Sequence, residues 1–521
     1  MSIVAAASLP LIRGYRFVGK ADALTHLGWT QDVLAGAIAP HEIFYPALHT
    51  LSAAFHLLGG VSLEHGMLLA VVALFVPFVI FVPLVVRDIT GSSLAVGMAA
   101  ILSWLVLPVN NISIHLGPHP NSHAIFFVPV ALFATVAFLR RRSDEERMVF
   151  GISPYAMLII IAGLGLLFIH PQQMANFVVL VGSIGLLQWR FRGAFDEHPI
   201  TDHPAILGHA FLLGGLFLAW SFSNARFREA LWGLGYGLLS GAIGAGSAVG
   251  QRGASLAEIG GSLLEVFAKM FLVPAAASVL VVLFVLAVWL GSTTIDRETR
   301  TFVNYFAVAM IPLGGIFVIY FLGTPTMAFR QVGFMLVIVT VLAGVALARV
   351  VAGAETTLTG AGTGAIVAIA IGACLMLSLL TLFGSPLIYN PNQQVTDATL
   401  SGYNTSFTGA SDAVPFVGMG YGADRYDNAL NGIEGRQQGV SVIEHEANQS
   451  KFGAGNYSGA FPSSEYYLTI TSYDIAREFI VYDELRYSTG AMEGLELYPW
   501  SNKAVSNDDF SLYTVRSPPG R

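Results

Sequence analysis

The stretch from Gly66 to Val86, GMLLAVVALFVPFVIFVPLVV, runs for 21 residues without a charged side chain. A helix rises about 1.5 Å per residue, so a segment of this length crosses the roughly 30 Å hydrocarbon core of a bilayer. A second run, FLVPAAASVLVVLFVLAVWL, covers residues 271–290. The chain of 521 residues is 54% hydrophobic and 11% charged, whereas soluble domains carry about 25% charged residues. These features predict an α-helical polytopic membrane protein.

Ten apolar segments are long enough to be membrane helices, and the apolar start of the chain is interpreted as the end of one more, which gives about 11. Arginines set the orientation, because positive charge is enriched in cytoplasmic loops. Arg140, Arg141, Arg142 and Arg147 share one short loop. Counting helices from that loop predicts a multi-pass protein of the cell membrane with a cytoplasmic N-terminus. The ten segments lie near residues 66–86, 91–108, 123–140, 150–169, 173–189, 203–221, 270–290, 302–322, 330–350 and 364–383.

The composition changes near residue 384. Residues 385–521 lack a membrane-length apolar run and carry 16 acidic and 8 basic residues, a net charge of −8 against −7 for the whole chain. Strand-like patches at 466–472, 478–488 and 510–515 are separated by Gly, Asn and Asp. We therefore expect a multi-spanning domain over 1–384 and a small α/β domain over 385–521, which the helix count places outside the cell. The acidic charge argues against a nucleic-acid partner.

The first predicted outer loop, residues 13–65, concentrates ionisable groups. It contains the stretch KADALTHLGWTQD at residues 20–32, and its apolar residues recur at helical spacing, which predicts amphipathic helices lying in the membrane interface. Asp22 and His26 are four residues apart and therefore share a helix face. A chemical site is one interpretation of this loop, and a solvated loop whose charges face water is the other. The loop also contains Asp32, Glu42 and His49.

Further polar clusters fall in loops predicted on the same outer side. His115, His119 and His123 belong to the turn NNISIHLGPHPNSH and could bind a metal, donate N–H groups to a phosphate, or form a polar turn that caps two helices. His170 lies in a similar tight turn. Arg330 and Gln331 open an apolar helix at its outer end. Positive charge is disfavoured on that side, so Arg330 is predicted to bind an anionic lipid phosphate rather than simply to face water.

The sequence contains no GxxxxGK[ST], HExxH, GxSxG or CxxC motif. The first would cradle nucleotide phosphates, so its absence argues against a kinase or an ATP-driven pump. The single cysteine, Cys374, lies in an apolar run and allows no disulfide framework.

Three pieces of the sequence carry a family resemblance: GKADALTHLGW at residues 19–29, FYPALHTL at 44–51 and NKAVSNDDFSLYTV at 502–515. Together with the apolar start they resemble the GT-C superfamily of polytopic glycosyltransferases, in its archaeal, protein O-mannosyltransferase-like branch. The resemblance implies a hexosyltransferase of the EC 2.4 type. Such an enzyme moves a hexose, expected to be mannose, with inversion from a dolichyl- or polyprenyl-phosphate donor to a surface-layer glycan, another extracytoplasmic glycan or a protein.

The resemblance also implies roles for particular residues. Asp22 matches the catalytic acid of the first outer loop, but Ala23 follows it where related enzymes often carry a second acid, so His26 or Asp32 is expected to fill that role. A Trp-Trp-Asp-Tyr-Gly signature is absent from residues 385–521, which disfavours block transfer of an oligosaccharide to asparagine. No cofactor is expected, although a divalent metal is an alternative. The expected donor-phosphate contacts are Arg330, His115, His119 and His170, and the expected acceptor contacts are Glu42, His49 and Gln331.

Two other functions remain open on the sequence. A lipid-linked glycan flippase or secondary transporter would place charges mid-span on several helices and would often show internal inverted repeats. A non-catalytic scaffold that displays residues 385–521 would tolerate the substitution Asp22→Asn.

Overall fold

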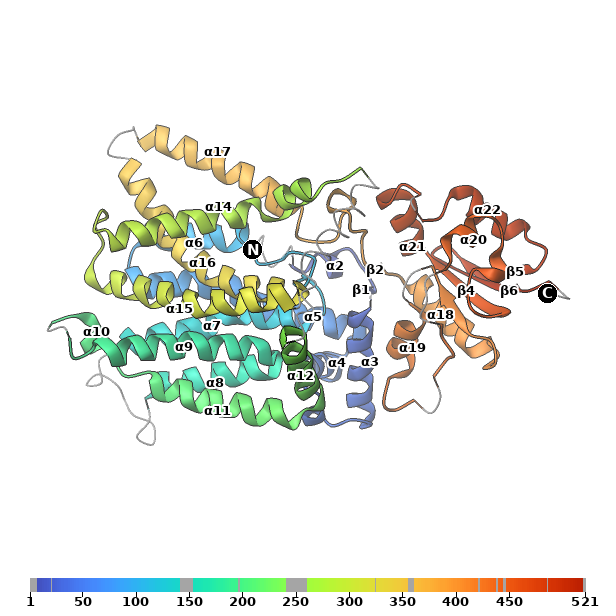
Figure 1. Ribbon diagram of the computed structural model, residues 1–521, viewed down its shortest axis with the longest axis horizontal. Coiled ribbons are helices and arrows are strands. Elements are labelled where there is room, and N and C mark those ends of the chain that lie inside the picture. The colour runs from blue at the N-terminus through green and yellow to red at the C-terminus, as the bar shows by residue number, and fades with distance from the viewer. Residues whose placement is uncertain are drawn as a thin grey trace.

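A computed structural model shows long, roughly parallel helices with a sheet-containing C-terminal part at one end of the bundle (Figure 1). Arg141, Arg142 and Arg147, on which the predicted orientation partly depends, lie outside the described residues. The structure describes residues 7–19, 21–140, 153–194, 197–239, 260–323, 325–354, 360–419, 422–436, 439–443, 447–484 and 486–518.

Seven helices in the described residues are long and apolar enough to cross a membrane, which gives the chain the build of a multi-pass membrane protein. Each of the ten predicted segments corresponds to a helix, but three of these helices are shorter. The apolar start contributes the four-residue helix α2 (Leu9–Ile12), so the predicted total of 11 spans is not established. The seven long helices are α5 (Leu63–Thr90), α7 (Pro120–Arg140), α9 (Pro171–Phe191), α14 (Leu263–Trp289), α15 (Arg297–Gly323), α16 (Pro325–Ala354) and α17 (Gly360–Leu379). The shorter ones are α6 (Ser93–Leu105), α8 (Pro154–Ile169) and α11 (Leu207–Ser223), and the further helices α10 (Pro199–Asp202) and α12 (Ala225–Leu239) connect or flank them.

Helices α7 and α16 form the centre of the bundle and are its most buried long helices, whereas α17 lies at the edge. Small residues let the central helices approach closely. A Cβ atom built on Gly344 of α16 would lie 2.7 Å from the Cβ of Ala99 on α6. Such contacts are typical of membrane helices, where van der Waals packing rather than the hydrophobic effect holds helices together.

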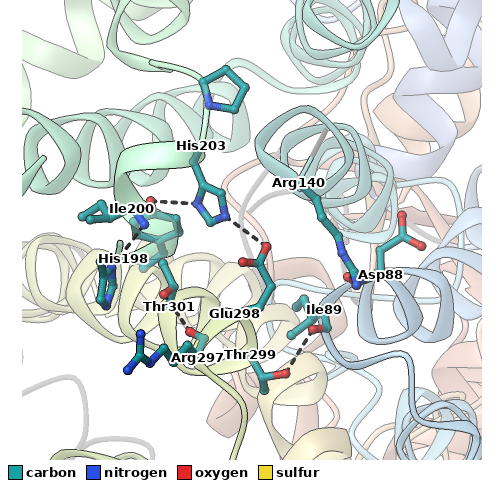
Figure 2. Close-up of polar contacts among 12 residues, drawn as sticks. Asp88, Ile89, Arg140, His198, Ile200, His203, Arg297, Glu298, Thr299 and Thr301 are labelled. Carbon is teal, nitrogen blue, oxygen red and sulfur yellow. Dashed lines mark hydrogen bonds and ion pairs between the residues drawn. The ribbon is translucent and has the colours of Figure 1, made fainter. Parts of the chain in front are cut away.

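The end of the bundle away from the C-terminal part gathers the loops that were predicted to share the cytoplasmic side (Figure 2). Arg140 at the end of α7 donates to the backbone carbonyl of Asp88 near the end of α5. His203, just after α10, lies 3.0 Å from Glu298 at the start of α15 through its Nε2 atom. Its Nδ1 atom lies 3.0 Å from the Tyr305 hydroxyl. The first contact joins the ends of α5 and α7, and the other two join the segment after α10 to α15.

The first outer loop folds largely into helices, as its periodicity predicts. Strand β1 (Phe17–Val18) precedes helix α3 (Asp22–Ala35), the 3-10 turn η1 (Pro40–Glu42) and helix α4 (Ala47–Gly59). Helix α3 ends at Gly36, whose φ of 70° lies in the left-handed region that glycine adopts without steric cost. Helix α4 ends in the same way at Gly60. The two helices cap the end of the bundle that faces the C-terminal part (Figure 1).

The C-terminal part contains a four-stranded sheet of order β3-β4-β6-β5, in which β3 and β4 are parallel and the other pairs antiparallel. Two of the three predicted strands are confirmed as β4 and β6. The strands are β3 (Phe416–Gly418), β4 (Glu465–Thr471), β5 (Ser501–Asn507) and β6 (Phe510–Arg516). Around them lie η3 (Pro386–Ile388), α18 (Asp397–Gly409), α19 (Ala423–Asn431), α20 (Gln449–Gly453), η4 (Tyr457–Gly459), α21 (Ser472–Ala476), η5 (Arg477–Val481) and α22 (Thr489–Leu497).

The predicted strand at 478–488 is wrong, because the chain turns into a helix directly after β4. The side chains of Thr471 and Asp474 cap this helix reciprocally, each accepting a backbone N–H of the other. The following residues continue as a π-helical turn in which Arg477 and Glu478 are both buried and paired at 2.9 Å. An alternating strand would have sent these two neighbouring side chains to opposite faces and separated the pair.

The C-terminal part does not stand apart from the first outer loop. Strand β1 pairs with β2 (Gln394–Val395), with Phe17 opposite Val395. Helix α3 packs on α19 so closely that a Cβ on Gly28 would lie 2.3 Å from the carbonyl oxygen of Asn428. One hydrophobic cluster contains buried residues from both segments. The division near residue 384 is therefore a change of composition, and the two parts share a core.

Candidate functional site

A cavity of about 250 Å³ lies at the end of the bundle that faces the C-terminal part. Four segments that are far apart in the sequence build its wall, together with one residue of α19. The lining residues are Asp22, Thr25, His26, Trp29 and Tyr45 from the first outer loop, His119, Pro120 and Asn121 from the start of α7, His170 before α9, Arg330 on α16, and Arg425 on α19.

Helix α3 supplies one wall through its spacing. Asp22, Thr25, His26 and Trp29 fall at i, i+3, i+4 and i+7, so all four lie on one face of the helix. Asp22 occupies the first turn, where the positive end of the helix dipole favours a negative charge. Its side chain is 70% exposed. The carboxylate is therefore accessible to a molecule in the cavity.

Arg330 brings a positive charge to the cavity without a protein counter-ion. Its Nε atom is buried and has no hydrogen-bond partner. No carboxylate of the described chain forms an ion pair with Arg330, whereas Asp22 acts on it only at longer range. Burying a cation without a partner is costly, and an anionic ligand removes that cost. Arg330 is thus the feature of the cavity that most directly indicates an anion.

Arg425 differs from Arg330 because its guanidinium contacts three side chains of the protein. Its Nη1 atom donates to the hydroxyl oxygen of Thr25 at 2.7 Å and lies 3.7 Å from the carboxylate of Asp22. Its Nε atom lies 3.2 Å from Asp424. The guanidinium of Arg425 therefore bridges α19 to the first turn of α3.

Aromatic rings form a continuous surface in the cavity wall. Tyr45 and His170 are stacked, with ring centroids 5.4 Å apart and an interplanar angle of 16°. His26 lies 5.6 Å from Trp29 and 5.9 Å from Tyr45, again between ring centroids. Aromatic faces carry partial negative charge and pack well against C–H groups. A sugar ring, which has apolar C–H faces and polar edges, matches such a surface.

Two histidines of the wall remain uncharged at neutral pH. Desolvation lowers the pKa of His170 to about 3, and the nearby charge of Arg330 contributes in the same direction. Desolvation likewise lowers the pKa of His119, helped by the neighbouring positive groups. Ser122 Oγ accepts the backbone N–H of His115 and lies 2.9 Å from Nδ1 of His119. If Ser122 donates its own proton to Nδ1, the ring hydrogen of His119 sits on Nε2 and is free to be donated.

His49 stands behind this wall and does not line the cavity. It is fully buried, and its Nε2 atom lies 3.1 Å from Nδ1 of His26. Burial lowers the pKa of His49 to about 4. A neutral His49 can therefore fix the ring of His26, which does reach the cavity.

Asp32, predicted as a possible catalytic acid, lies elsewhere. It is 2% exposed, and its carboxylate accepts the backbone N–H groups of Ile433, Glu434 and Gly435 at 2.9, 3.0 and 3.1 Å. These contacts explain its burial and fasten α3 to the loop after α19. A carboxylate already occupied by three donors and away from the cavity has a structural role in this fold.

The remaining predicted residues do not line the cavity either. Glu42 is exposed and accepts the backbone N–H of Ala39 at 2.7 Å, which is a local cap. Gln331 is buried beside Arg330 and donates to the carbonyl of Leu313. His115 packs edge-on against His119 at a centroid distance of 5.4 Å, so it supports a residue of the wall.

Sequence reasoning missed the aromatic wall and Arg425. Trp29 and Tyr45 stand within the two stretches that carry the family resemblance, GKADALTHLGW and FYPALHTL, but their spacing alone does not bring them together. Arg425 is a rare base in an acidic part of the chain, and that contrast is the one local signal for it. Within the described part of the chain, no group of three or more His, Cys, Asp or Glu side chains could hold a metal ion.

Comparisons with protein-family models and with curated proteins found no match to this chain.

Proposed function

We propose that this protein is a membrane glycosyltransferase of the GT-C type that transfers a hexose from a dolichyl- or polyprenyl-phosphate donor to a glycan or protein acceptor. The observation that carries the proposal is one cavity shared by an accessible carboxylate, Asp22, and a cation, Arg330, that has no ion-pair partner among the described residues. Acid-base chemistry beside an anion site is what transfer from a sugar phosphate requires.

The donor phosphate would bind at Arg330. As the sugar departs, negative charge grows on the phosphate oxygen that was joined to the anomeric carbon. Arg330 would stabilise this charge. The rings of His119 and His170 also line the cavity and, because they are neutral, could donate hydrogen bonds to the phosphate without adding positive charge beside Arg330. The lipid tail would remain in the bilayer alongside the apolar helices.

Asp22 would act as the general base. It would take the proton of the acceptor hydroxyl while that oxygen forms a bond to the anomeric carbon. The bond from the anomeric carbon to the phosphate oxygen would break in the same step, and its electron pair would leave with the lipid phosphate. Attack opposite the leaving group inverts the anomeric configuration. A positioned base of this kind contributes typically 10²–10⁴-fold to the rate.

The size and position of the cavity support the same function. Its volume of about 250 Å³ is just below the ~300 Å³ at which typical ligand sites begin, so a single sugar phosphate suits it better than a long oligosaccharide. The cavity lies at the end of the helices, whereas transporters bind substrate near the middle of the membrane. With the orientation that the arginines predict, this end faces the outside of the cell.

The test measures transfer of radiolabelled mannose from dolichyl-phosphate mannose to native surface glycans. Membranes would contain the wild type, Asp22→Asn, Arg330→Ala or the control Glu465→Gln, which removes a carboxylate of the C-terminal part that pairs with Arg516 and does not line the cavity. We expect Asp22→Asn to lose at least about 100-fold in rate, the low end for a missing base. Arg330→Ala should raise the donor KM, and Glu465→Gln should stay close to wild type.

Two outcomes would count against the proposal. Equal transfer by the wild type and Asp22→Asn would remove Asp22 from the chemistry. The second outcome is that the inserted wild type transfers no sugar from any of a panel of dolichyl-phosphate hexoses. This result would favour a flippase or a scaffold as the function. Binding of unlabelled dolichyl phosphate to the purified protein separates these cases, because a scaffold has no reason to bind it through Arg330.

A further inference from the structure

We propose that Arg425, from the acidic C-terminal part, is a positioning residue that holds the Asp22 carboxylate in place, so that the active site is complete only when α19 is docked on α3. This inference rests on the proposed function and deepens it. It assigns to residues 385–521 a direct task at the site, in addition to any role in stability.

The side chain of Asp22 has conformational freedom of its own. Its side chain is 70% exposed and stands in the first turn of α3, directly after Ala21, which has a φ of 50°. A carboxylate in that setting can occupy several rotamers. Among the described residues its ion-pair partner is Arg425, at 3.7 Å. Removal of Arg425 would therefore leave the orientation of the base unrestrained.

Arg425 is itself held in place by contacts with its neighbours. Thr25, one turn after Asp22 on the same face of α3, accepts from Nη1 at 2.7 Å. Asp424 holds Nε at 3.2 Å. The backbone of α19 is set by its contact with α3, where Gly28 leaves no room for a side chain next to Asn428. The docked position of α19 thus determines where the guanidinium of Arg425 lies, and the guanidinium in turn orients the carboxylate of Asp22.

The two arginines of the cavity differ in whether carboxylates balance their charge. Arg330 has no carboxylate partner in the described chain, so its charge is available to a ligand. Arg425 faces two carboxylates, which balance its charge. A balanced guanidinium adds little to the binding of a phosphate but restricts its partners through several hydrogen-bonding groups. The two residues should therefore affect different kinetic constants.

The experiment compares kcat and KM for dolichyl-phosphate mannose in full-length protein carrying Arg425→Ala, Arg425→Lys, Thr25→Val or Arg330→Ala. A control, Lys503→Ala, removes a cation of the C-terminal part that pairs with Glu496 away from the cavity. We expect Arg425→Ala to lower kcat by roughly 10- to 100-fold, the scale of a misplaced catalytic group, with donor KM nearly unchanged. Thr25→Val should give a smaller loss of kcat, Arg425→Lys should recover part of it, and Arg330→Ala should raise KM.

A donor KM that rises in Arg425→Ala as much as in Arg330→Ala would overturn the inference, because Arg425 would then bind the phosphate. Loss of kcat together with early thermal unfolding, as in an undocked Gly28→Val protein, would reduce Arg425 to a structural contact and would also overturn it. Modification of Asp22 by a water-soluble carbodiimide, followed by mass spectrometry, gives a readout without turnover. The carboxylate should react faster in Arg425→Ala, and an unchanged rate would refute the positioning role even if the wild type transfers no sugar and the proposed function fails.

Discussion

Replacing Asp32 tests whether this acid holds the fold together or takes part in catalysis. The structure predicts that Asp32→Ala loosens the loop after α19, whereas Asp32→Asn preserves most of the attachment and nearly all of the activity. The carboxylate accepts three successive backbone N–H groups, from Ile433, Glu434 and Gly435, at 2.9–3.1 Å. None of these contacts involves the cavity.

The size of the effect follows from the number of bonds and their exposure. Hydrogen bonds to charged groups are worth about 1.5–3 kcal/mol each when buried. Glu434 and Gly435 are exposed, so water can replace the lost acceptor and a net value of about 1 kcal/mol per bond is appropriate. Asp32→Ala should therefore destabilise the closed loop by about 3 kcal/mol, which corresponds to roughly a 100-fold rise in the open population. Asp32→Asn keeps one carbonyl acceptor and should lose about half as much.

Hydrogen exchange measured by mass spectrometry on the detergent-solubilised protein reports this opening directly. Amides of residues 433–435 should exchange much faster in Asp32→Ala and moderately faster in Asp32→Asn. Transfer of mannose by Asp32→Asn should stay within a few-fold of wild type. Asp22→Asn is the reciprocal control, since it should abolish transfer and leave exchange at 433–435 unchanged. An Asp32→Asn protein with unchanged exchange and at least about a 100-fold loss of transfer would refute the structural role.

Two further predictions concern stability. His49 has a pKa of about 4 in the fold against 6.5 when unperturbed, so the unfolded chain binds a proton between these values that the native protein does not. His49 should therefore contribute roughly 3 kcal/mol to a fall in stability as pH drops from 6.5 to 4, and His119 and His170, whose pKa values are also lowered, should add to this fall. His49→Gln should make this dependence less steep in thermal unfolding curves, and an equally steep curve would show that His49 does not contribute to it. Gly344→Leu should destabilise the bundle by about 1–3 kcal/mol through overpacking against Ala99, whereas Gly215→Leu on α11, where a Cβ meets nothing within 4 Å, should be tolerated. Equal thermal stability of the two variants would contradict the tight packing of α16 on α6.

The sequence predicted the helices of this protein well, and for a local reason. A run such as residues 66–86 has to form a helix in a bilayer, because the backbone polar groups of each spanning segment must be satisfied within the segment. Composition and length alone therefore locate α5 or α14, whatever their neighbours are. The same local logic identified the helical first outer loop and the strands β4 and β6. It failed at 478–488, where a buried pair of charges, Arg477 and Glu478, favours a helical turn over the strand that the local pattern predicts.

Part of the lining of the cavity could be predicted from the sequence. Asp22, Arg330, His26, His119 and His170 share the cavity, and each stands in a loop or at a helix end that the arginine count had placed on one side of the membrane.

Only the tertiary structure separates the ionisable residues that reach the cavity from those that hold the fold. Asp22 and Asp32 lie ten residues apart on the same short helix, and nothing local distinguishes them. Asp32 finds its donors in residues 433–435, and Thr25 meets Arg425 across a separation of 400 residues. Helix formation depends on neighbours in the chain, whereas the partners of a charged side chain depend on which distant segments pack beside it. That packing exists only in the folded molecule, and it is what brings the C-terminal part to the cavity.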